Sequence, residues 1–187
     1  MLNIAVFVSG GGTNLQNLID TELVGGRITL VVASNNTAYA LERARKHKIE
    51  SIVFKKNDDE NELLRILEDR QTGLIVLAGY LNILSPFFLK SFKGTVINIH
   101  PSLLPEYGGI GMYGLKVHEA VLADKKTITG ATVHIVTEVP DGGEILDQIQ
   151  VPVLIDDTPS TLQARVMDIG EKILLPRVVK KLCERSH

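Results

Sequence analysis

Short apolar runs alternate with segments of helical periodicity through the first hundred residues. The apolar runs are compact and rich in β-branched residues or leucine, which is typical of buried strands. The predicted strands are 3–8, 29–33, 51–54, 74–77 and 95–99. The helical patterns between them cover 13–23, 38–47, 60–69 and 86–92. This alternation predicts a mostly parallel sheet that is covered by helices on both faces.

The pattern changes after residue 100. A glycine-rich loop at 105–114 leads to a predicted helix at 115–123. Two longer strands follow at 127–137 and 145–153, and the turn sequence PDGG between them predicts that they are antiparallel. A last helix is predicted over 160–182, with Ser160 as its N-cap and a kink at Pro176.

The whole pattern predicts one doubly wound, Rossmann-like α/β domain over residues 1–187, with a mostly parallel sheet and an antiparallel C-terminal strand pair. No repeat, low-complexity tract or linker divides the sequence.

Composition narrows the functional classes. The net charge is −2 and aromatic residues make up 5%, which disfavours a nucleic-acid partner. The single cysteine, Cys183, cannot form an internal disulfide and fits a reducing compartment. No apolar run reaches the ~20 residues that span a bilayer, and the N-terminus reads as a strand and not as a signal peptide. We therefore expect a cytoplasmic protein with no membrane partner.

The sequence around residue 98 carries the clearest candidate chemistry. Asn98 and His100 lie two apart in an apolar strand, so they share one face while Ile97 and Ile99 point to the other. Pro101 disfavours a helical conformation at His100 and places it at the strand's end. An amide donor beside an imidazole suits a reaction in which an oxygen gains charge and a proton moves. The alternative is a chance pair of polar residues.

A second candidate is the glycine loop at 9–15, between the first strand and the first helix. It is not a dinucleotide fingerprint, because Leu15 stands where the third glycine would fall, and no Lys-Ser/Thr pair makes it a P-loop. The loop can bind one phosphate through backbone N–H groups, with Thr13 and Asn14 as further donors. The alternative is a tight turn with an N-cap.

Other polar residues are ambiguous on sequence alone. Thr132 and His134 share one strand face and form either a polar wall of a cleft or satisfied core residues. Asp141 in the PDGG turn either orients an imidazole or serves the turn alone. His118 is ambiguous, and the remaining histidines are expected to be solvated; they are His47 and His187. The histidines lack metal-site spacing, so we expect no metal.

Five motifs in fixed order resemble the phosphoribosylglycinamide formyltransferase family, the folate-dependent transformylases of purine biosynthesis. They are SGGGTNLQ at 9–16, VLAGYLNILSP at 76–86, INIHPSLLP at 97–105, GATVHIV at 130–136 and EVPDGGEIL at 138–146. The resemblance covers nearly the whole chain. It implies a single domain of the formyltransferase fold that moves a formyl group from 10-formyltetrahydrofolate to the amine of glycinamide ribonucleotide by direct attack, through a tetrahedral intermediate.

The resemblance also implies the site residues. The family's catalytic trio corresponds to Asn98, His100 and Asp141. Its ribonucleotide site corresponds to Gly11, Gly12, Thr13, Asn14 and Glu171. Its folate pocket corresponds to Leu81, Asn82, Ile83, Leu84, Val136, Thr137, Glu138, Val139, Pro140 and Asp141. Both small molecules are substrates, no metal is implied, and we expect a monomer or a homodimer.

Two other functions fit parts of the pattern. A formyltetrahydrofolate deformylase shares the Asn/His/Asp machinery but has no use for a phosphate loop. A nucleotide-binding module without catalysis uses the glycine loop but leaves the Asn98, His100 and Asp141 pattern unexplained. Methionyl-tRNA formyltransferase, a further relative of the core, is disfavoured because the chain has no excess of basic residues.

Overall fold

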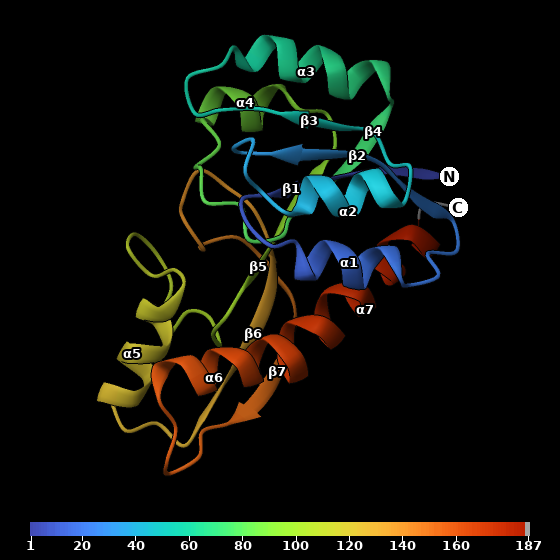
Figure 1. Ribbon diagram of the computed structural model, residues 1–187. Helices are drawn as coiled ribbons and strands as arrows, with labels where there is room; N and C mark the ends of the chain where they lie inside the picture. The colour runs from blue at the N-terminus through green and yellow to red at the C-terminus, as the bar shows by residue number, and fades with distance from the viewer. Residues whose placement is uncertain (186–187) are drawn as a thin grey trace. The chain divides into compact units, whose positions relative to one another are not determined.

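The computed structural model describes residues 1–185 and has the predicted order of strands and helices (Figure 1). The strands are β1 (Leu2–Val8), β2 (Gly26–Ala33), β3 (Ser51–Val53), β4 (Thr72–Leu77), β5 (Thr95–His100), β6 (Ile128–Ile135) and β7 (Ile145–Pro152). The helices are α1 (Thr13–Ile19), α2 (Ala40–Lys46), α3 (Glu60–Asp69), α4 (Pro86–Ser91), α5 (Leu115–Ala123), α6 (Pro159–Arg165), a π-helical turn (Val166–Glu171) and α7 (Lys172–Arg185). His187 lies outside the described residues.

The strands form one mixed sheet in the order β3-β2-β1-β4-β5-β6-β7. β1 pairs in parallel with β2 and β4, and β2 pairs in parallel with β3. β6 and β7 are antiparallel, as the PDGG turn predicted. Residues Ile4 to Val8 of β1 are fully buried, because a central parallel strand is covered on both faces. The predicted α/β class and the antiparallel C-terminal strand pair are confirmed.

Two compact units make up the chain, residues 1–97 with the segment from Val179 onward, and residues 98–178. In the first unit α3 and α4 lie side by side (Figure 1). In the second unit α5 packs against α6. The glycine loop at 9–15 belongs to the first unit, and the second unit begins at Asn98 within β5.

The C-terminal helix differs from the prediction. Its N-cap is Thr158 and not Ser160, because Thr158 and Thr161 form a reciprocal capping box and Pro159 takes the first helical position. Pro176 lies inside α7, where the helix is regular. The departure from α geometry is in the π-helical turn that precedes α7. Pro176 has no N–H to donate to the Lys172 carbonyl, four residues before it. The π-helical turn ends directly before Lys172.

Most other boundaries agree with the prediction to within a few residues. The largest difference is α1, which ends at Ile19 and not at residue 23. There the Asp20 N–H bonds back to the Gln16 carbonyl, and the Thr21 hydroxyl donates to the Asn17 carbonyl at 2.6 Å. A threonine hydroxyl that bonds the carbonyl four residues before it competes with the helical backbone bond, which disfavours continuation of the helix. Across residues 1–185, no helix has the length and apolarity that a bilayer crossing requires.

Candidate functional site

The glycine loop of the first unit packs against α2. Gly12, the N-cap of α1, has a φ of 71°, and a Cβ there would lie 2.7 Å from the Cβ of Ala40. Only glycine meets both constraints without strain. The Arg43 Nε donates to the Gly11 carbonyl at 2.8 Å, and the Ala40 N–H donates to the Gly10 carbonyl at 3.2 Å. Because these bonds occupy loop carbonyls, they favour a loop that offers N–H groups to an anion.

The Ser9 hydroxyl joins this loop to the predicted folate segment. Its Oγ accepts the Leu81 N–H at 2.9 Å and the Ser34 hydroxyl at 2.7 Å. The Leu81 and Ile83 side chains are exposed, whereas Leu84 is buried. The segment at 81–84 therefore exposes the apolar side chains of Leu81 and Ile83, while the Leu81 N–H ties its backbone to the glycine loop.

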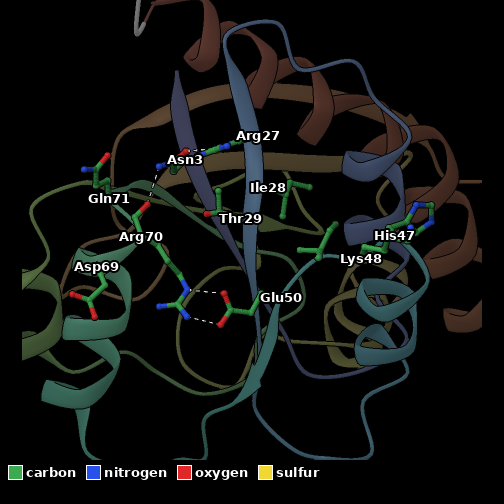
Figure 2. A pocket seen from close by; sticks show the side chains of 11 residues that line it. Asn3, Arg27, Ile28, Thr29, His47, Lys48, Glu50, Asp69, Arg70 and Gln71 are labelled. Carbon is green, nitrogen blue, oxygen red and sulfur yellow. Dashed lines mark hydrogen bonds and ion pairs between the residues drawn. The ribbon is translucent and has the colours of Figure 1, made fainter.

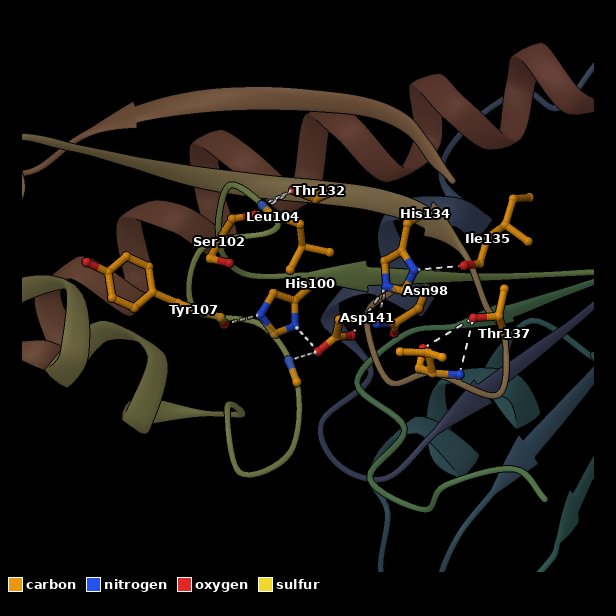
Figure 3. Close-up of polar contacts among 12 residues, drawn as sticks. Asn98, His100, Ser102, Leu104, Tyr107, Thr132, His134, Ile135, Thr137 and Asp141 are labelled. Atoms are coloured by element: carbon orange, nitrogen blue, oxygen red, sulfur yellow. Dashed lines mark hydrogen bonds and ion pairs between the residues drawn. The ribbon is translucent and has the colours of Figure 1, made fainter. Parts of the chain in front are cut away.

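Four polar side chains meet in the second unit (Figure 3). The Asp141 carboxylate lies between two imidazoles, with Oδ2 at 3.6 Å from the Nδ1 of His100 and Oδ1 at 3.4 Å from the Nε2 of His134. The Nδ2 of Asn98 lies 3.2 Å from the same nitrogen of His134. The structure thus brings together the predicted trio and adds His134, which the sequence left ambiguous.

Backbone groups fix how these imidazoles carry their protons. The Nε2 of His100 is 2.7 Å from the Tyr107 carbonyl, and the Nδ1 of His134 is 2.9 Å from the Ile135 carbonyl. A carbonyl only accepts, so each of these nitrogens carries a proton. The Asn98 amide and the Asp141 carboxylate both lie at the Nε2 of His134, and the Nδ1 of His100 faces Asp141. No sequence motif predicts the Tyr107 contact, because a main-chain carbonyl is common to every residue type.

Burial and charge act against each other in this cluster. Burial lowers the pKa of His100. The Asp141 charge and the Tyr107 carbonyl raise this pKa, but by less, so it stays below its ordinary value. Burial raises the pKa of Asp141, but bonding from His134, the His100 charge and the Gly109 N–H together bring it below its ordinary value. Asp141 is therefore ionised and His100 neutral at pH 7.

The turn that carries Asp141 is shaped by Gly143 and by Asp141 itself. Asp141 has a φ of 54°, which aspartate tolerates better than most residues. A Cβ on Gly143 would overlap the Ile135 carbonyl, so a glycine is required where the turn crosses the end of β6. The Gly109 N–H donates to the Asp141 Oδ2 at 2.8 Å. Asp141 thus serves the turn and also faces both imidazoles.

Thr132 makes different contacts from His134, with which it was predicted to share a strand face. Its hydroxyl donates to the Ser102 carbonyl at 2.6 Å, and accepts the Leu104 N–H at 3.0 Å and the Gln148 amide at 2.9 Å. All of its hydrogen-bonding capacity is used inside the protein. Thr132 therefore holds the segment that follows His100 through its hydrogen bonds to Ser102 and Leu104.

The remaining predicted residues lie on other parts of the second unit. Glu171 is the last residue of the π-helical turn and is half-buried; such turns occur frequently at functional sites. The Thr137 hydroxyl bonds the backbone of Val139 at 3.3 Å, which shapes the connection after β6. Thr137, Glu138, Val139 and Pro140 are exposed and Val136 is half-buried.

His118 in α5 is fully buried, and within residues 1–185 neither of its ring nitrogens has a hydrogen-bond partner. Burial, with a smaller contribution from the His100 charge, lowers the pKa of His118 from 6.5 to about 4. His47, by contrast, is exposed, as predicted.

His118 makes stability depend on pH. Its folded-state pKa lies below its unfolded-state value of 6.5, so its contribution is complete above pH 6.5 and is lost as the pH falls toward 4. We expect the free energy of unfolding to fall over this window by up to about 1.4 kcal/mol per pH unit, and His118→Leu to flatten the slope. Urea unfolding at several pH values measures this, with His47→Gln as the control. Equal slopes in the wild type and His118→Leu would contradict the assignment.

A large open cavity of about 620 Å³ lies elsewhere in the first unit, and it is lined by none of the predicted site residues (Figure 2). Several of its polar side chains bond to one another. Arg70 forms an ion pair with Glu50, the Arg27 Nε donates to the Asn3 Oδ1 at 2.9 Å, and the Asn3 amide donates to the Arg70 carbonyl at 2.8 Å. Size alone therefore does not make this cavity the site. Within the described 185 residues, no cluster of three or more His, Cys, Asp or Glu could hold a metal ion.

Residues 2–179 match the family of formyl transferases, and the chain belongs to that family. It is 38% identical to a phosphoribosylglycinamide formyltransferase of Haemophilus influenzae, over 98% of this chain and 88% of that protein. It is 40% identical to the chloroplastic phosphoribosylglycinamide formyltransferase of Vigna unguiculata over 97% of this chain, and spans 61% of that relative's length. The crystal structure of phosphoribosylglycinamide formyltransferase from Anaplasma phagocytophilum superposes with a TM-score of 0.91 at 32% identity, over 98% of this chain and 88% of that one.

Proposed function

We propose that the chain transfers the formyl group of 10-formyltetrahydrofolate to the amine of glycinamide ribonucleotide. The observation that carries the proposal is the Asp141 carboxylate between two imidazoles, with the Asn98 amide beside them. The relatives named as phosphoribosylglycinamide formyltransferases support the choice of substrates. The family match from residue 2 to 179 takes in parts of both units, which supports a single formyltransferase domain.

In the proposed reaction the amine attacks the formyl carbon, and the carbonyl electron pair moves onto oxygen. Asn98 donates an N–H to that oxyanion, as preorganised amide donors do in acyl transfer. The neutral His100 accepts the amine proton on Nδ1, and the imidazolium so formed is stabilised by the Asp141 carboxylate. The oxyanion electron pair then re-forms the C=O bond, the C–N bond to the folate breaks, and the proton passes from His100 to the departing folate nitrogen.

The binding residues follow from the same proposal. The glycine loop, with Gly11, Gly12, Thr13 and Asn14, holds the ribonucleotide phosphate, and Glu171 contacts the same nucleotide. The segments 81–84 and 136–141 hold the folate. Their exposed apolar side chains, with those of Leu81, Ile83 and Val139 among them, suit a flat heterocycle.

The direct test follows tetrahydrofolate formation from 10-formyltetrahydrofolate with and without glycinamide ribonucleotide. We expect turnover only when the ribonucleotide is present. Turnover that does not depend on the ribonucleotide would assign the chain as a deformylase, in which water is the acceptor. Ribonucleotide binding without any turnover would leave the non-catalytic nucleotide-binding module.

Thr13→Val tests the phosphate loop. The substitution keeps the shape of the exposed Thr13 side chain and removes its hydroxyl, so the KM for the ribonucleotide should rise about tenfold with little change in kcat, as for one hydrogen bond to a charged group. Steady-state kinetics measures both constants. Thr21→Val, just beyond α1 in the same unit, is the matched control. An unchanged KM would argue against a phosphate at this loop.

A further inference from the structure

The proton on His100 is fixed by one residue of the loop that follows it. The Tyr107 carbonyl lies 2.7 Å from the Nε2 of His100, which therefore carries the proton. The lone pair of neutral His100 is then on Nδ1, the nitrogen 3.6 Å from the Asp141 carboxylate. Had the proton been on Nδ1, the imidazole could not take a further proton on the side that faces Asp141. The direction of this one carbonyl therefore decides which nitrogen is the base.

Tyr107 points its carbonyl at His100 from an unusual backbone conformation. Its φ is 54°, in the left-handed region that a bulky residue rarely occupies. Such a conformation persists only where the surrounding structure holds it. The holding contact is at the other end of the side chain, where the Tyr107 hydroxyl donates to the Asp124 Oδ2 at 2.7 Å, just after α5 ends (Figure 3 labels Tyr107).

Neighbouring contacts hold the same loop. The Lys126 ammonium bonds the Glu106 carboxylate at 2.9 Å and lies 6.0 Å from the centre of the Tyr107 ring. The Ser102 hydroxyl donates to the Glu106 carbonyl at 2.6 Å. Two residues beyond Tyr107, the Gly109 N–H donates to Asp141. The loop at 101–109 thus contacts both His100 and Asp141.

We propose that Tyr107 is a positioning residue for the reaction. Its bond to Asp124 keeps the Tyr107 carbonyl aimed at His100, so that neutral His100 holds its proton on Nε2 and presents Nδ1 as the base. The inference rests on the proposed function for its catalytic consequence, but the tautomer itself can be measured without substrate. The groups that face His100 are Asp141, His134 and His118. None of them offers Nε2 the acceptor that Tyr107 provides. Burial and Asp124 together raise the pKa of the Tyr107 phenol to about 12, so its hydroxyl remains a donor at neutral pH.

The test measures the tautomer of His100 by ¹⁵N–¹H NMR of the ring nitrogens, with the His100 signals assigned from a His100→Gln sample. We expect a protonated Nε2 and an unprotonated Nδ1 in the wild type. Tyr107→Phe and Asp124→Ala should each produce a mixture of tautomers and lower kcat about tenfold, with an unchanged KM for the ribonucleotide. The double variant should be no worse than either single one, because both remove the same bond.

Two further variants separate positioning from general destabilisation. Asp124→Asn retains an oxygen acceptor and should keep the wild-type tautomer and kcat. Tyr113→Phe removes a hydroxyl from an exposed tyrosine beyond this loop, before α5, and should change neither. The proposal is overturned if the wild type carries its proton on Nδ1, or if Tyr107→Phe keeps the Nε2–H tautomer. An Nε2–H tautomer in an enzyme that turns over nothing would instead count against the proposed function alone.

Discussion

Asp141→Asn is expected to lower kcat by about 10²–10⁴, the range usual for loss of general acid–base assistance, and to change the KM for the ribonucleotide by no more than a few fold. The substitution keeps the shape of the side chain but removes the charge that stabilises the imidazolium of His100. The side chain lies 3.6 Å from the His100 Nδ1, whereas the glycine loop at 9–15, where we propose that the ribonucleotide phosphate binds, belongs to the first unit. Steady-state kinetics at saturating folate separates the two constants.

The pH profile gives a second measure of the same substitution. The Asp141 charge raises the pKa of His100 against the opposing effect of burial. Its removal should therefore shift the acid limb of kcat/KM to lower pH. Asp168→Asn is the control, because its carboxylate is 72% exposed and forms a surface pair with Lys172 at 3.3 Å. Retention of kcat in Asp141→Asn, or an equal loss in ribonucleotide affinity, would remove Asp141 from the catalytic machinery.

Asn98→Ala should lower kcat by about 10²–10³, the effect of removing one donor to an oxyanion. The Asn98 amide lies 3.2 Å from the His134 Nε2, and its second N–H is available to a developing negative charge. The loss should appear in kcat and in kcat/KM alike, because the interaction forms only as the oxygen gains charge.

Asn98→Asp distinguishes an electrostatic effect from a packing effect at this position. Aspartate fills the same volume but offers only acceptors when ionised, so it should repel the oxyanion and be at least as impaired as Asn98→Ala. Recovery of activity in Asn98→Asp would mean that Asn98 only fills space. Isothermal titration with the ribonucleotide alone should show an affinity close to that of the wild type in both variants.

The amino-acid sequence was sufficient for the class of fold. Compact β-branched runs such as residues 3–8 are buried on both faces in any parallel sheet, so local composition already identifies them as strands. The Asn98/His100 spacing placed both residues at the end of β5, because a strand alternates faces and Pro101 follows. The PDGG turn likewise predicted the β6/β7 pair. These signals are local, and each acts over only a few residues.

Helix termini were less predictable, because several residues compete for each position. Thr158 and Ser160 are both good N-caps, and the capping box with Thr161 decided between them. Pro176 indicated an irregular helix, but the structure places the π-helical turn before it. The backbone there packs closely, since a Cβ on Gly170 would lie 3.3 Å from the Cβ of Ala131.

Only the tertiary structure decided how the polar residues are used. Thr132 and His134 have equivalent positions on one face of a strand in the sequence pattern. In the structure, Thr132 bonds the segment after His100, whereas His134 lies beside Asp141. The protonation of His100 depends on burial and on the Tyr107 carbonyl, which come from contacts that no motif records. Sequence patterns determine which side chains share a strand face, whereas pKa and tautomer depend on every group packed around them, and those groups meet only when the chain has folded.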